Sequence, residues 1–202
     1  MPVKAVVFDV GNVLFDWDIR ALYAPLIADP ARLDWFCTNV ITPEWHFQHD
    51  AGRPFAETSA ELIARFPGEA DLIALFGPRF AETITGPLPG MIELVERLAH
   101  RGVPLFAITN FSEEFWLPFR AATPLFDRFQ DIIVSGTERL VKPDPAIYQL
   151  ALRRFGLAPG EAIFIDDRAD NVAGAVANGF IGHQFAGHDA LESELLRRGL
   201  LD

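Results

Sequence analysis

Polar residues that could do chemistry follow several apolar runs of this 202-residue chain. The first is Asp9, which directly follows Ala5-Val6-Val7-Phe8 and precedes Gly11-Asn12. A carboxylate at the end of a buried strand is costly unless a charge, a metal or hydrogen bonds compensate it. The sequence therefore indicates an aspartate held against a cation, in a site that handles an anionic substrate.

Three further segments carry residues of the same kind. Thr109-Asn110 follows the run Leu105 to Ile108, and Asp166-Asp167 follows the run Ala162 to Ile165. Lys142 stands just before a helix whose start is set by proline. Ligands of an open α/β sheet bind beyond the carboxyl ends of its strands, so we expect these residues to meet at one site.

The chain resembles the haloacid dehalogenase-like hydrolase superfamily in four motifs, which have the same order and spacing. These are Asp9, Thr109-Asn110, Lys142-Pro143-Asp144 and Asp166-Asp167. Two longer segments, Phe8 to Leu14 and Phe164 to Asn171, are most similar to one branch of that superfamily. This branch holds sugar-phosphate phosphatases of the glucose-1-phosphate phosphatase type. The resemblance spans nearly the whole chain, and four motifs in order are far more specific than any one of them.

The resemblance implies a role for each matching residue. Asp9 would be the nucleophile that attacks phosphorus and forms an aspartyl-phosphate, which water later hydrolyses. Thr109 and Asn110 would donate hydrogen bonds to phosphate oxygens. Lys142 would act in catalysis and phosphate binding, because it supplies a fixed positive charge between the phosphate and Asp9.

Mg²⁺ is the implied cofactor, because a carboxylate and a phosphate cannot approach each other without neutralisation. Its expected ligands are a carboxylate oxygen of Asp9, the backbone carbonyl of Gly11, and Asp167. Asp166 belongs to the same metal site, where it and Asn171 would orient bound water or hold the ligands in place.

Gly11 departs from the family pattern, which usually has a second aspartate at this position. That aspartate protonates the leaving oxygen and later activates water, a form of help typically worth ~10²–10⁴-fold in rate. Asp16, Asp18 or one of two cap histidines, His46 and His49, could stand in for the missing acid. Alternatively, a substrate with an acidic leaving group could react without one, as a sugar 1-phosphate does at its anomeric oxygen.

Two other functions stay open. A 2-haloacid dehalogenase would use the same Asp9 nucleophile without a metal, and it shares the non-acidic residue at Gly11. Asp166-Asp167 favours the metal-dependent phosphatase, because two adjacent carboxylates facing Asp9 would repel it without a cation. The third candidate is a phosphate-binding pseudo-enzyme that lost turnover together with the acid at Gly11.

Parallel strands must position these residues. Short, fully apolar runs rich in β-forming residues alternate with helical patterns, which predicts a doubly wound parallel α/β sheet, a Rossmann-like core. The expected strands are 5–8, 104–108, 131–134, 162–165 and 180–183. The expected helices are 91–100, 145–155 and 171–178, and a last packing helix falls between 191 and 200.

One stretch breaks this alternation. From about Ile19 to Ile84 the pattern is helical and amphipathic, with recurring aromatic residues and no convincing strand. We therefore expect a helical cap at 16–85, inserted into a hydrolase core formed by 1–15 and 86–202. The segment Gly86 to Gly90 would be the linker back to the core. A lobe inserted at this point would form a lid over the site.

Composition limits the partners. The formal net charge of −11 argues against a nucleic acid or an anionic membrane as the main partner. No apolar stretch approaches the ~20 residues that a membrane-spanning helix needs. Cys37 is the only cysteine, so an intrachain disulfide is excluded and a cytoplasmic protein is expected. The prediction is a cytoplasmic Mg²⁺-dependent phosphatase, monomeric or homodimeric, for a small phosphorylated metabolite, with a sugar phosphate as the first expectation.

Overall fold

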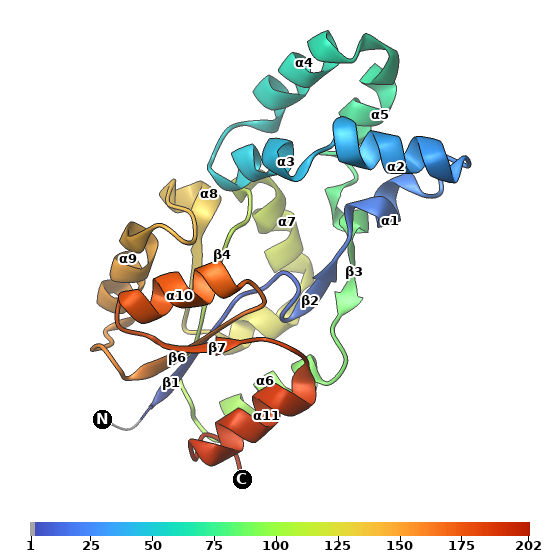
Figure 1. Ribbon diagram of the computed structural model, residues 1–202. Helices are drawn as coiled ribbons and strands as arrows, with labels where there is room; N and C mark the ends of the chain where they lie inside the picture. The colour runs from blue at the N-terminus through green and yellow to red at the C-terminus, as the bar shows by residue number, and fades with distance from the viewer. Residues whose placement is uncertain (1–2) are drawn as a thin grey trace.

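The central sheet is parallel, as the sequence predicts. In a computed structural model that describes residues 3–202, its strands are β1 (Ala5–Phe8), β4 (Leu105–Thr109), β5 (Asp131–Val134), β6 (Ala162–Asp166) and β7 (Ile181–Gln184). They lie in the order β5-β4-β1-β6-β7, so the first strand is central (Figure 1). The chain places β4 and β5 on one side of β1 and then β6 and β7 on the other, which gives the doubly wound arrangement.

Helices cover both faces of the sheet. They are α6 (Met91–His100), α9 (Pro145–Phe155), α10 (Ala169–Ala177) and α11 (His188–Arg197). Alternate residues of β1 point to opposite faces. Ala5 and Val7 pack in one apolar cluster with residues of α9 and α10, whereas Val6 and Phe8 pack in another with residues of α6 and α11. Burial on both faces explains why the strand is apolar throughout.

The sequence patterns located these elements closely. The bounds of β1, β5, α6 and α9 are as expected, β6 is one residue longer, and β4 and β7 are each shifted by one residue. Helix α10 begins two residues earlier than expected and ends one residue earlier, and α11 lies three residues earlier. Three elements between β4 and α9 were not expected: α7 (Glu113–Ala122), the 3-10 helix η3 (Pro124–Arg128) and α8 (Ser135–Glu138). Pro118 lies inside α7, where a proline ordinarily argues against a helix.

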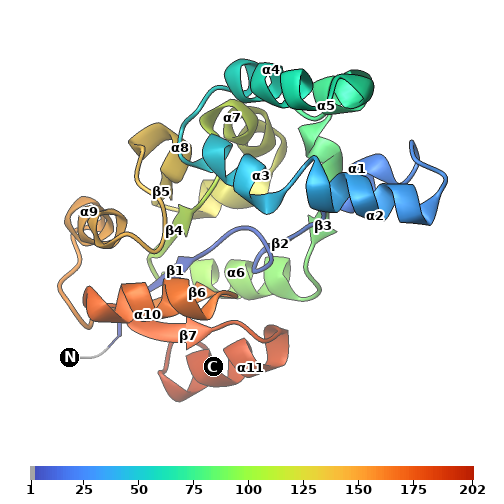
Figure 2. The same ribbon diagram turned by 45° about the horizontal axis from the view of Figure 1, so that its top comes forward.

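A helical segment is inserted between β1 and α6. It contains α1 (Ile19–Tyr23), α2 (Pro30–Asn39), α3 (Pro43–Asp50), α4 (Phe55–Arg65), η1 (Pro67–Glu69), α5 (Ala70–Leu75) and η2 (Phe80–Thr83). Figures 1 and 2 place these helices, from blue to green, beyond the carboxyl ends of the strands. The predicted fold class, a doubly wound sheet with an inserted helical cap, is confirmed.

A two-stranded antiparallel ribbon connects this helical segment to the sheet. Its strands are β2 (Phe15–Trp17) and β3 (Ile84–Pro87), which pair Phe15 with Pro87 and Asp16 with Gly86. The stretch from Ile19 to Ile84 is helical up to the start of β3, as expected, but the expectation of a plain linker from Gly86 was wrong, because Gly86 and Pro87 belong to β3. Strands of three and four residues are too short to show a period of two, so only their pairing reveals them.

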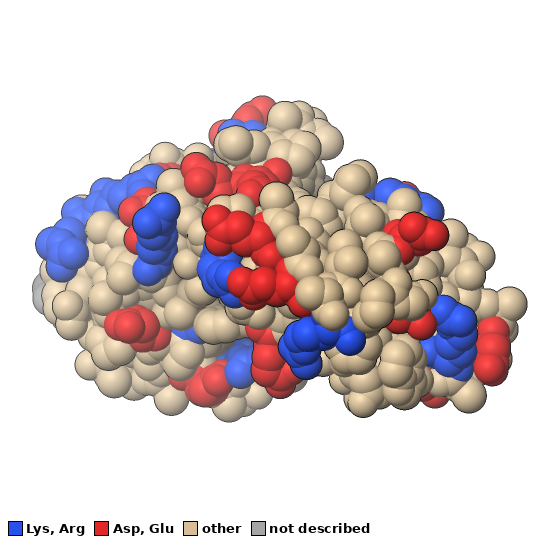
Figure 3. All heavy atoms as spheres, turned by 90° about the horizontal axis from the view of Figure 1, so that it is seen from above, with Lys and Arg blue, Asp and Glu red and all other residues tan. Residues whose placement is uncertain are grey.

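A membrane or a charged partner would need particular features of the helices or of the molecular surface. No helix within residues 3–202 combines the length and the apolar composition needed to cross a bilayer. On the face seen from above, Lys and Arg side chains lie in separate groups among Asp and Glu (Figure 3). This mixture of charges agrees with the acidic overall composition.

Candidate active site

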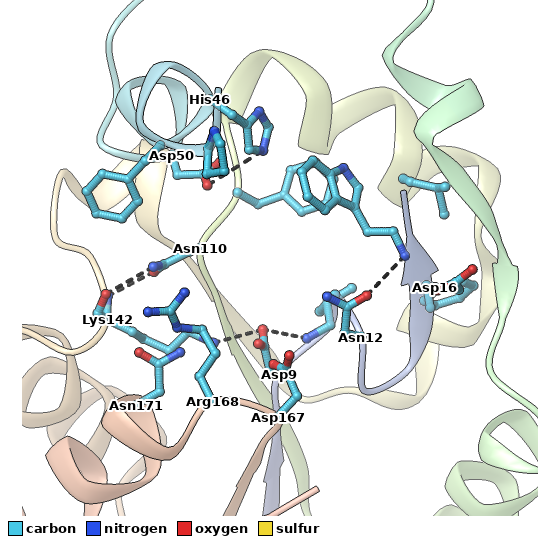
Figure 4. Close-up of a pocket in the computed structure, with 18 of the residues that line it drawn as sticks. Asp9, Asn12, Asp16, His46, Asp50, Asn110, Lys142, Asp167, Arg168 and Asn171 are labelled. Carbon is cyan, nitrogen blue, oxygen red and sulfur yellow. Dashed lines mark hydrogen bonds and ion pairs between the residues drawn. The ribbon is translucent and has the colours of Figure 1, made fainter. Parts of the chain in front are cut away.

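A cavity of about 420 Å³ lies between the carboxyl ends of the central strands and the inserted helical segment (Figure 4). The predicted site residues that line it are Asp9, Gly11, Asp16, Asn110, Lys142, Asp167 and Asn171. Thr109 and Asp166 are buried and do not line the cavity. Seven of the nine predicted residues, drawn from four regions of the sequence, therefore line one cavity.

The sheet register brings Asp9 and Asp166 side by side. Phe8 is paired with Ile165, and the Asp9 backbone N–H donates to the Ile165 carbonyl at 2.8 Å. Lys142 reaches this point from the loop before α9. Its Nζ lies 2.8 Å from Asp9 Oδ1 and 2.7 Å from Asp166 Oδ2. One buried ammonium thus bridges two buried carboxylates.

Burial and these charges set the protonation states in opposite directions. Burial alone would lower the pKa of Lys142, but Asp9 and Asp166 more than offset it, and the net pKa is raised. Lys142 is therefore a permanent cation. Burial also raises the pKa of Asp9, to about 7, although the Lys142 ammonium acts to lower it. The charged form of Asp9 thus depends on a neighbouring cation.

Asp166 is held by hydrogen bonds rather than left open to a ligand. Its Oδ1 accepts from the Arg168 backbone N–H at 2.9 Å and from Asn171 Nδ2 at 3.0 Å. Its Oδ2 accepts from Lys142 Nζ at 2.7 Å. Asp166 and Asn171 therefore hold each other, Lys142 and the chain at Arg168 in place.

The remaining oxygens fit a hard cation. Asp9, Asp166 and Asp167 each offer a carboxylate oxygen, and these oxygens lie within 4.8 Å of one another. The Asp167 carboxylate has no hydrogen bond to another side chain in residues 3–202, and within the same residues the Gly11 carbonyl accepts none. Burial raises the pKa of Asp167, and the charge of Asp166 adds to this effect. A cation bound here would reverse both unfavourable effects.

The side chain of Asn110 holds the backbone of Lys142. Its Oδ1 accepts from the Lys142 backbone N–H at 2.8 Å, and its Nδ2 donates to the Lys142 carbonyl at 3.1 Å. The side chain of Asn110 therefore positions the lysine. The amide nitrogen carries a second N–H, so this residue still has a side-chain donor as well as its backbone N–H for a phosphate.

The turn after Asp9 explains the local sequence. Asn12 has a φ of 56°, in the left-handed region that asparagine tolerates better than most residues. Its Oδ1 accepts from the Trp17 backbone N–H at 3.2 Å, which holds the turn. A Cβ added to Gly11 would meet no atom within 4 Å. Packing therefore does not require a glycine at position 11.

The residues expected to replace the missing acid differ in placement. Asp16 is exposed on the cavity wall, where its carboxylate accepts a hydrogen bond from the Thr85 hydroxyl. Asp18 caps helix α1 by accepting from the Arg20 backbone N–H at 2.8 Å. Burial lowers the pKa of His46 to about 3 and, together with Arg53, that of His49 to about 4. Both imidazoles are therefore neutral at neutral pH, so neither is a suitable proton donor to a leaving group.

Two charged residues that line the cavity were not predicted as site residues. Asp50 is the last residue of α3, and Arg168 follows Asp167 on the opposite wall (Figure 4). Arg168 pairs with Asp170 at 2.7 Å and is largely exposed. Arg168 carried a usable signal, since it directly follows a strand-end motif. Asp50 carried none, because only the docking of the helical segment brings it to the site.

Comparison with known proteins finds the same family that the sequence motifs resemble. A family described as haloacid dehalogenase-like hydrolase matches residues 3–179. The sesquiterpene phosphatase astK of Aspergillus oryzae is 28% identical, over 89% of this chain and 88% of that protein. A phosphoglycolate phosphatase of Thiobacillus denitrificans is 27% identical, over 89% and 81% of the two chains. The fold is also that of the HAD family enzyme BT-2542 from Bacteroides thetaiotaomicron, solved as a magnesium complex. The two share 20% identity and a TM-score of 0.74, over 98% of this chain and all of that one.

Proposed function

The chain belongs to the haloacid dehalogenase-like hydrolases, and we propose that within this family it is a Mg²⁺-dependent phosphatase for a small phosphorylated metabolite. The observation that carries the proposal is the group of three carboxylates, Asp9, Asp166 and Asp167, beside a cavity with Lys142 between two of them. Three acidic groups and one ammonium leave a negative site, which needs a cation before a phosphate can enter.

The proposed cation is held by Asp9, Asp167 and the Gly11 carbonyl. Carboxylate and carbonyl oxygens suit Mg²⁺, which is usually bound by few protein ligands and by the substrate phosphate. A fold neighbour solved as a magnesium complex supports this choice. When bound, the cation would neutralise the phosphate and the Asp9 carboxylate as they approach each other.

The residues of the chain would then divide the reaction between them. An Asp9 carboxylate oxygen attacks phosphorus and forms an aspartyl-phosphate, and water later attacks that phosphorus to release phosphate. Lys142 holds the nucleophile in place and stabilises negative charge at the phosphoryl oxygens. Thr109 and Asn110 are proposed as phosphate donors. Asp166 and Asn171 keep the Lys142 ammonium and the chain after β6 in position.

The domain division is part of the proposal. Residues 1–15 and 86–202 would form the hydrolase core, and residues 16–85 would form the cap that covers the substrate. The β2–β3 ribbon at the boundary offers two connections that can bend together. Closure of the cap would exclude bulk water from the aspartyl-phosphate until the alcohol has left.

The leaving group is proposed to be small, with a sugar phosphate as the first candidate. A second candidate is the phosphate ester of an apolar alcohol, because aromatic side chains form much of the wall beyond the carboxylates. These side chains are Phe15, Trp17, Phe80, Phe111 and Phe119. A relative named as a sesquiterpene phosphatase supports this second candidate. Aromatic rings also stack on sugar rings, so the two classes must be compared directly.

A substrate screen tests the function. Purified protein and Asp9→Asn are assayed on sugar phosphates, phosphoglycolate, a prenyl monophosphate and p-nitrophenyl phosphate, with Mg²⁺ and with EDTA. We expect phosphate release that needs Mg²⁺ and that falls on the order of 10³-fold or more in Asp9→Asn. Halide release from short 2-haloacids in EDTA would instead identify a dehalogenase. Phosphate binding without turnover of any ester would identify a pseudo-enzyme.

A further inference from the structure

Asp50 occupies a position that no motif of the sequence indicates. It is only 7% exposed, yet it lines the cavity. Figure 4 shows its carboxyl on the wall formed by the inserted helical segment, across the cavity from Asp9 and Asp167. Its Oδ1 is buried and has no hydrogen-bond partner among residues 3–202. An unpartnered buried carboxyl oxygen at a ligand cavity is costly, and a ligand that bonds to it would remove this cost.

The position of Asp50 is fixed from both sides of the cavity. The Ser135 hydroxyl donates to the Asp50 backbone carbonyl at 2.6 Å and accepts from the Phe111 backbone N–H at 2.9 Å. Ser135 itself is fully buried. His46 lies one helical turn earlier, with its Nε2 3.7 Å from Asp50 Oδ2. Since this imidazole is neutral, it does not provide the cation that would hold Asp50 ionised.

We propose that Asp50 is the general acid and base of this phosphatase and performs from the cap the task that the side chain missing at Gly11 performs elsewhere in the family. This inference rests on the proposed function. In an in-line displacement the leaving oxygen lies opposite the attacking oxygen. A group that protonates the leaving oxygen must therefore lie across the cavity from Asp9, which is where Asp50 lies.

The proton and electron pairs balance over the two half-reactions. In the first, an Asp9 oxygen bonds to phosphorus, the bond from phosphorus to the leaving oxygen breaks, and its electron pair takes the proton of the Asp50 carboxyl. The alcohol leaves, and Asp50 becomes a carboxylate. In the second, water attacks phosphorus and gives one proton to Asp50. The bond to Asp9 then breaks, which regenerates the Asp9 carboxylate and releases phosphate.

The surroundings of Asp50 favour the protonated form that the first step needs. Burial raises its pKa to about 8, and the negative charge of Asp9 adds to the increase. The Lys142 ammonium and the backbone N–H of Ser112 act in the opposite direction. Together with His46, these are the groups that face Asp50 from the core, from the start of α7 and from its own helix. The other candidate, Asp16, is exposed and bonded to the Thr85 hydroxyl.

The test compares two esters of similar size. The p-nitrophenolate of p-nitrophenyl phosphate can leave without being protonated. The alkoxide of benzyl phosphate must be protonated as it leaves. In the Mg²⁺-loaded protein we expect Asp50→Asn to lower the rate of alcohol release from benzyl phosphate in the first turnover by ~10²–10⁴-fold. Release of p-nitrophenol in the first turnover should fall by less than about tenfold, because this step needs no acid, and it also reports that the variant is folded. The loss of benzyl phosphate turnover at high pH should disappear in the variant.

A rescue and a control complete the test. Gly11→Asp, placed in the Asp50→Asn protein, should restore much of the benzyl phosphate turnover, because the added carboxyl has free space. Asp29→Asn is the matched control: Asp29 caps α2 in the same helical segment, away from the cavity, and asparagine caps equally well. Equal losses of the first-turnover rate on both esters, or no loss on either, would overturn the role of Asp50 alone. A wild-type protein inactive on both esters with Mg²⁺ would overturn the proposed function as well.

Discussion

Lys142 lies in the interior of the site between two carboxylates, and its charge is needed for stability as well as for chemistry. It is 2% exposed, and its partners Asp9 and Asp166 are also buried. Removal of one member of such a group leaves the others as uncompensated buried charges. The same ammonium is proposed to bind the phosphate, so its loss should affect two independent measurements.

Lys142→Met is expected to lower the free energy of unfolding by about 3–5 kcal/mol. Urea denaturation with EDTA measures this, and added Mg²⁺ should recover part of the loss, because it supplies positive charge at the same carboxylates. Lys4→Met is the control, since Lys4 pairs with Glu161 at 2.7 Å but is half exposed. That solvent-accessible pair should contribute far less, so Lys4→Met should change the free energy of unfolding little. Equal losses in the two variants would contradict the charge balance described here.

Asp50 should make the protein less stable as the pH rises. Its folded pKa is raised from 3.8 to about 8, mainly by burial. A carboxyl with a raised pKa keeps its proton in the folded state after the unfolded chain has lost it. Its contribution to stability is therefore present below the unfolded pKa and is lost as the pH rises through the folded one.

Asp50→Asn removes this titration. We expect the variant to melt at a higher temperature than the wild type at about pH 8, with a gap that narrows towards about pH 5. Thermal melts in EDTA across this range measure the gap, and Asp29→Asn serves again as the control. A gap that stays constant with pH would mean that folding does not raise the pKa of Asp50. A stabilising change that lowers turnover is typical of a catalytic group.

At the scale of elements, helix α8 connects the cap to the core. It begins at Ser135, whose hydroxyl bonds to α3 at the Asp50 carbonyl and to the chain after β4 at Phe111. Gly136, the next residue, donates its backbone N–H to the Phe111 carbonyl at 3.0 Å. A Cβ on Gly136 would lie 2.6 Å from the Glu113 nitrogen, so this contact of α8 with α7 requires glycine. The four-residue helix thereby sets the distance between Asp50 and the core.

Ser135→Ala is expected to leave the Asp50 carbonyl and the Phe111 N–H without partners, at a cost of about 1–3 kcal/mol in unfolding free energy. Because Asp50 also loses its fixed position, alcohol release from benzyl phosphate in the first turnover should fall more than release of p-nitrophenol. Ser193→Ala is the matched control, since its exposed hydroxyl bonds only to Asp189 within α11. Its effect should stay within about 0.5 kcal/mol. Similar effects of the two serine variants would argue against a role for α8.

At the scale of the whole molecule, a chain with a net charge of −11 concentrates its few useful cations in one cavity. Lys142 lies at its base, and Arg168 lies at its side (Figure 4). The cavity of about 420 Å³ is covered by the inserted helical segment. Its size suits a metabolite, and in the proposed function the segment that covers it would hinder a phosphate on a folded protein from reaching Asp9.

Small esters should therefore be strongly preferred. We expect kcat/KM for a phosphorylated protein to be lower than for p-nitrophenyl phosphate on the order of 100-fold or more, because the phosphate would be held out of line with Asp9. Phosphate release from phosphocasein measures this, with free phosphoserine as the control for the leaving group. Comparable rates on the protein and on the free amino acid would show that the cap does not limit access.

The sequence by itself determined the sheet and the strand-end chemistry. Fully apolar runs mark strands buried on both faces, and the polar residues that end them must meet, because parallel strands end at one edge. Asp9 and Asp167 could be placed together on these grounds, and Lys142 was added by its match to the family motif. The tertiary structure decided the rest: the β2–β3 ribbon, the use of Asn110 to hold Lys142, and the place of Asp50. These features depend on pairing, hydrogen bonds and burial between residues far apart in the chain, and no local pattern encodes such contacts.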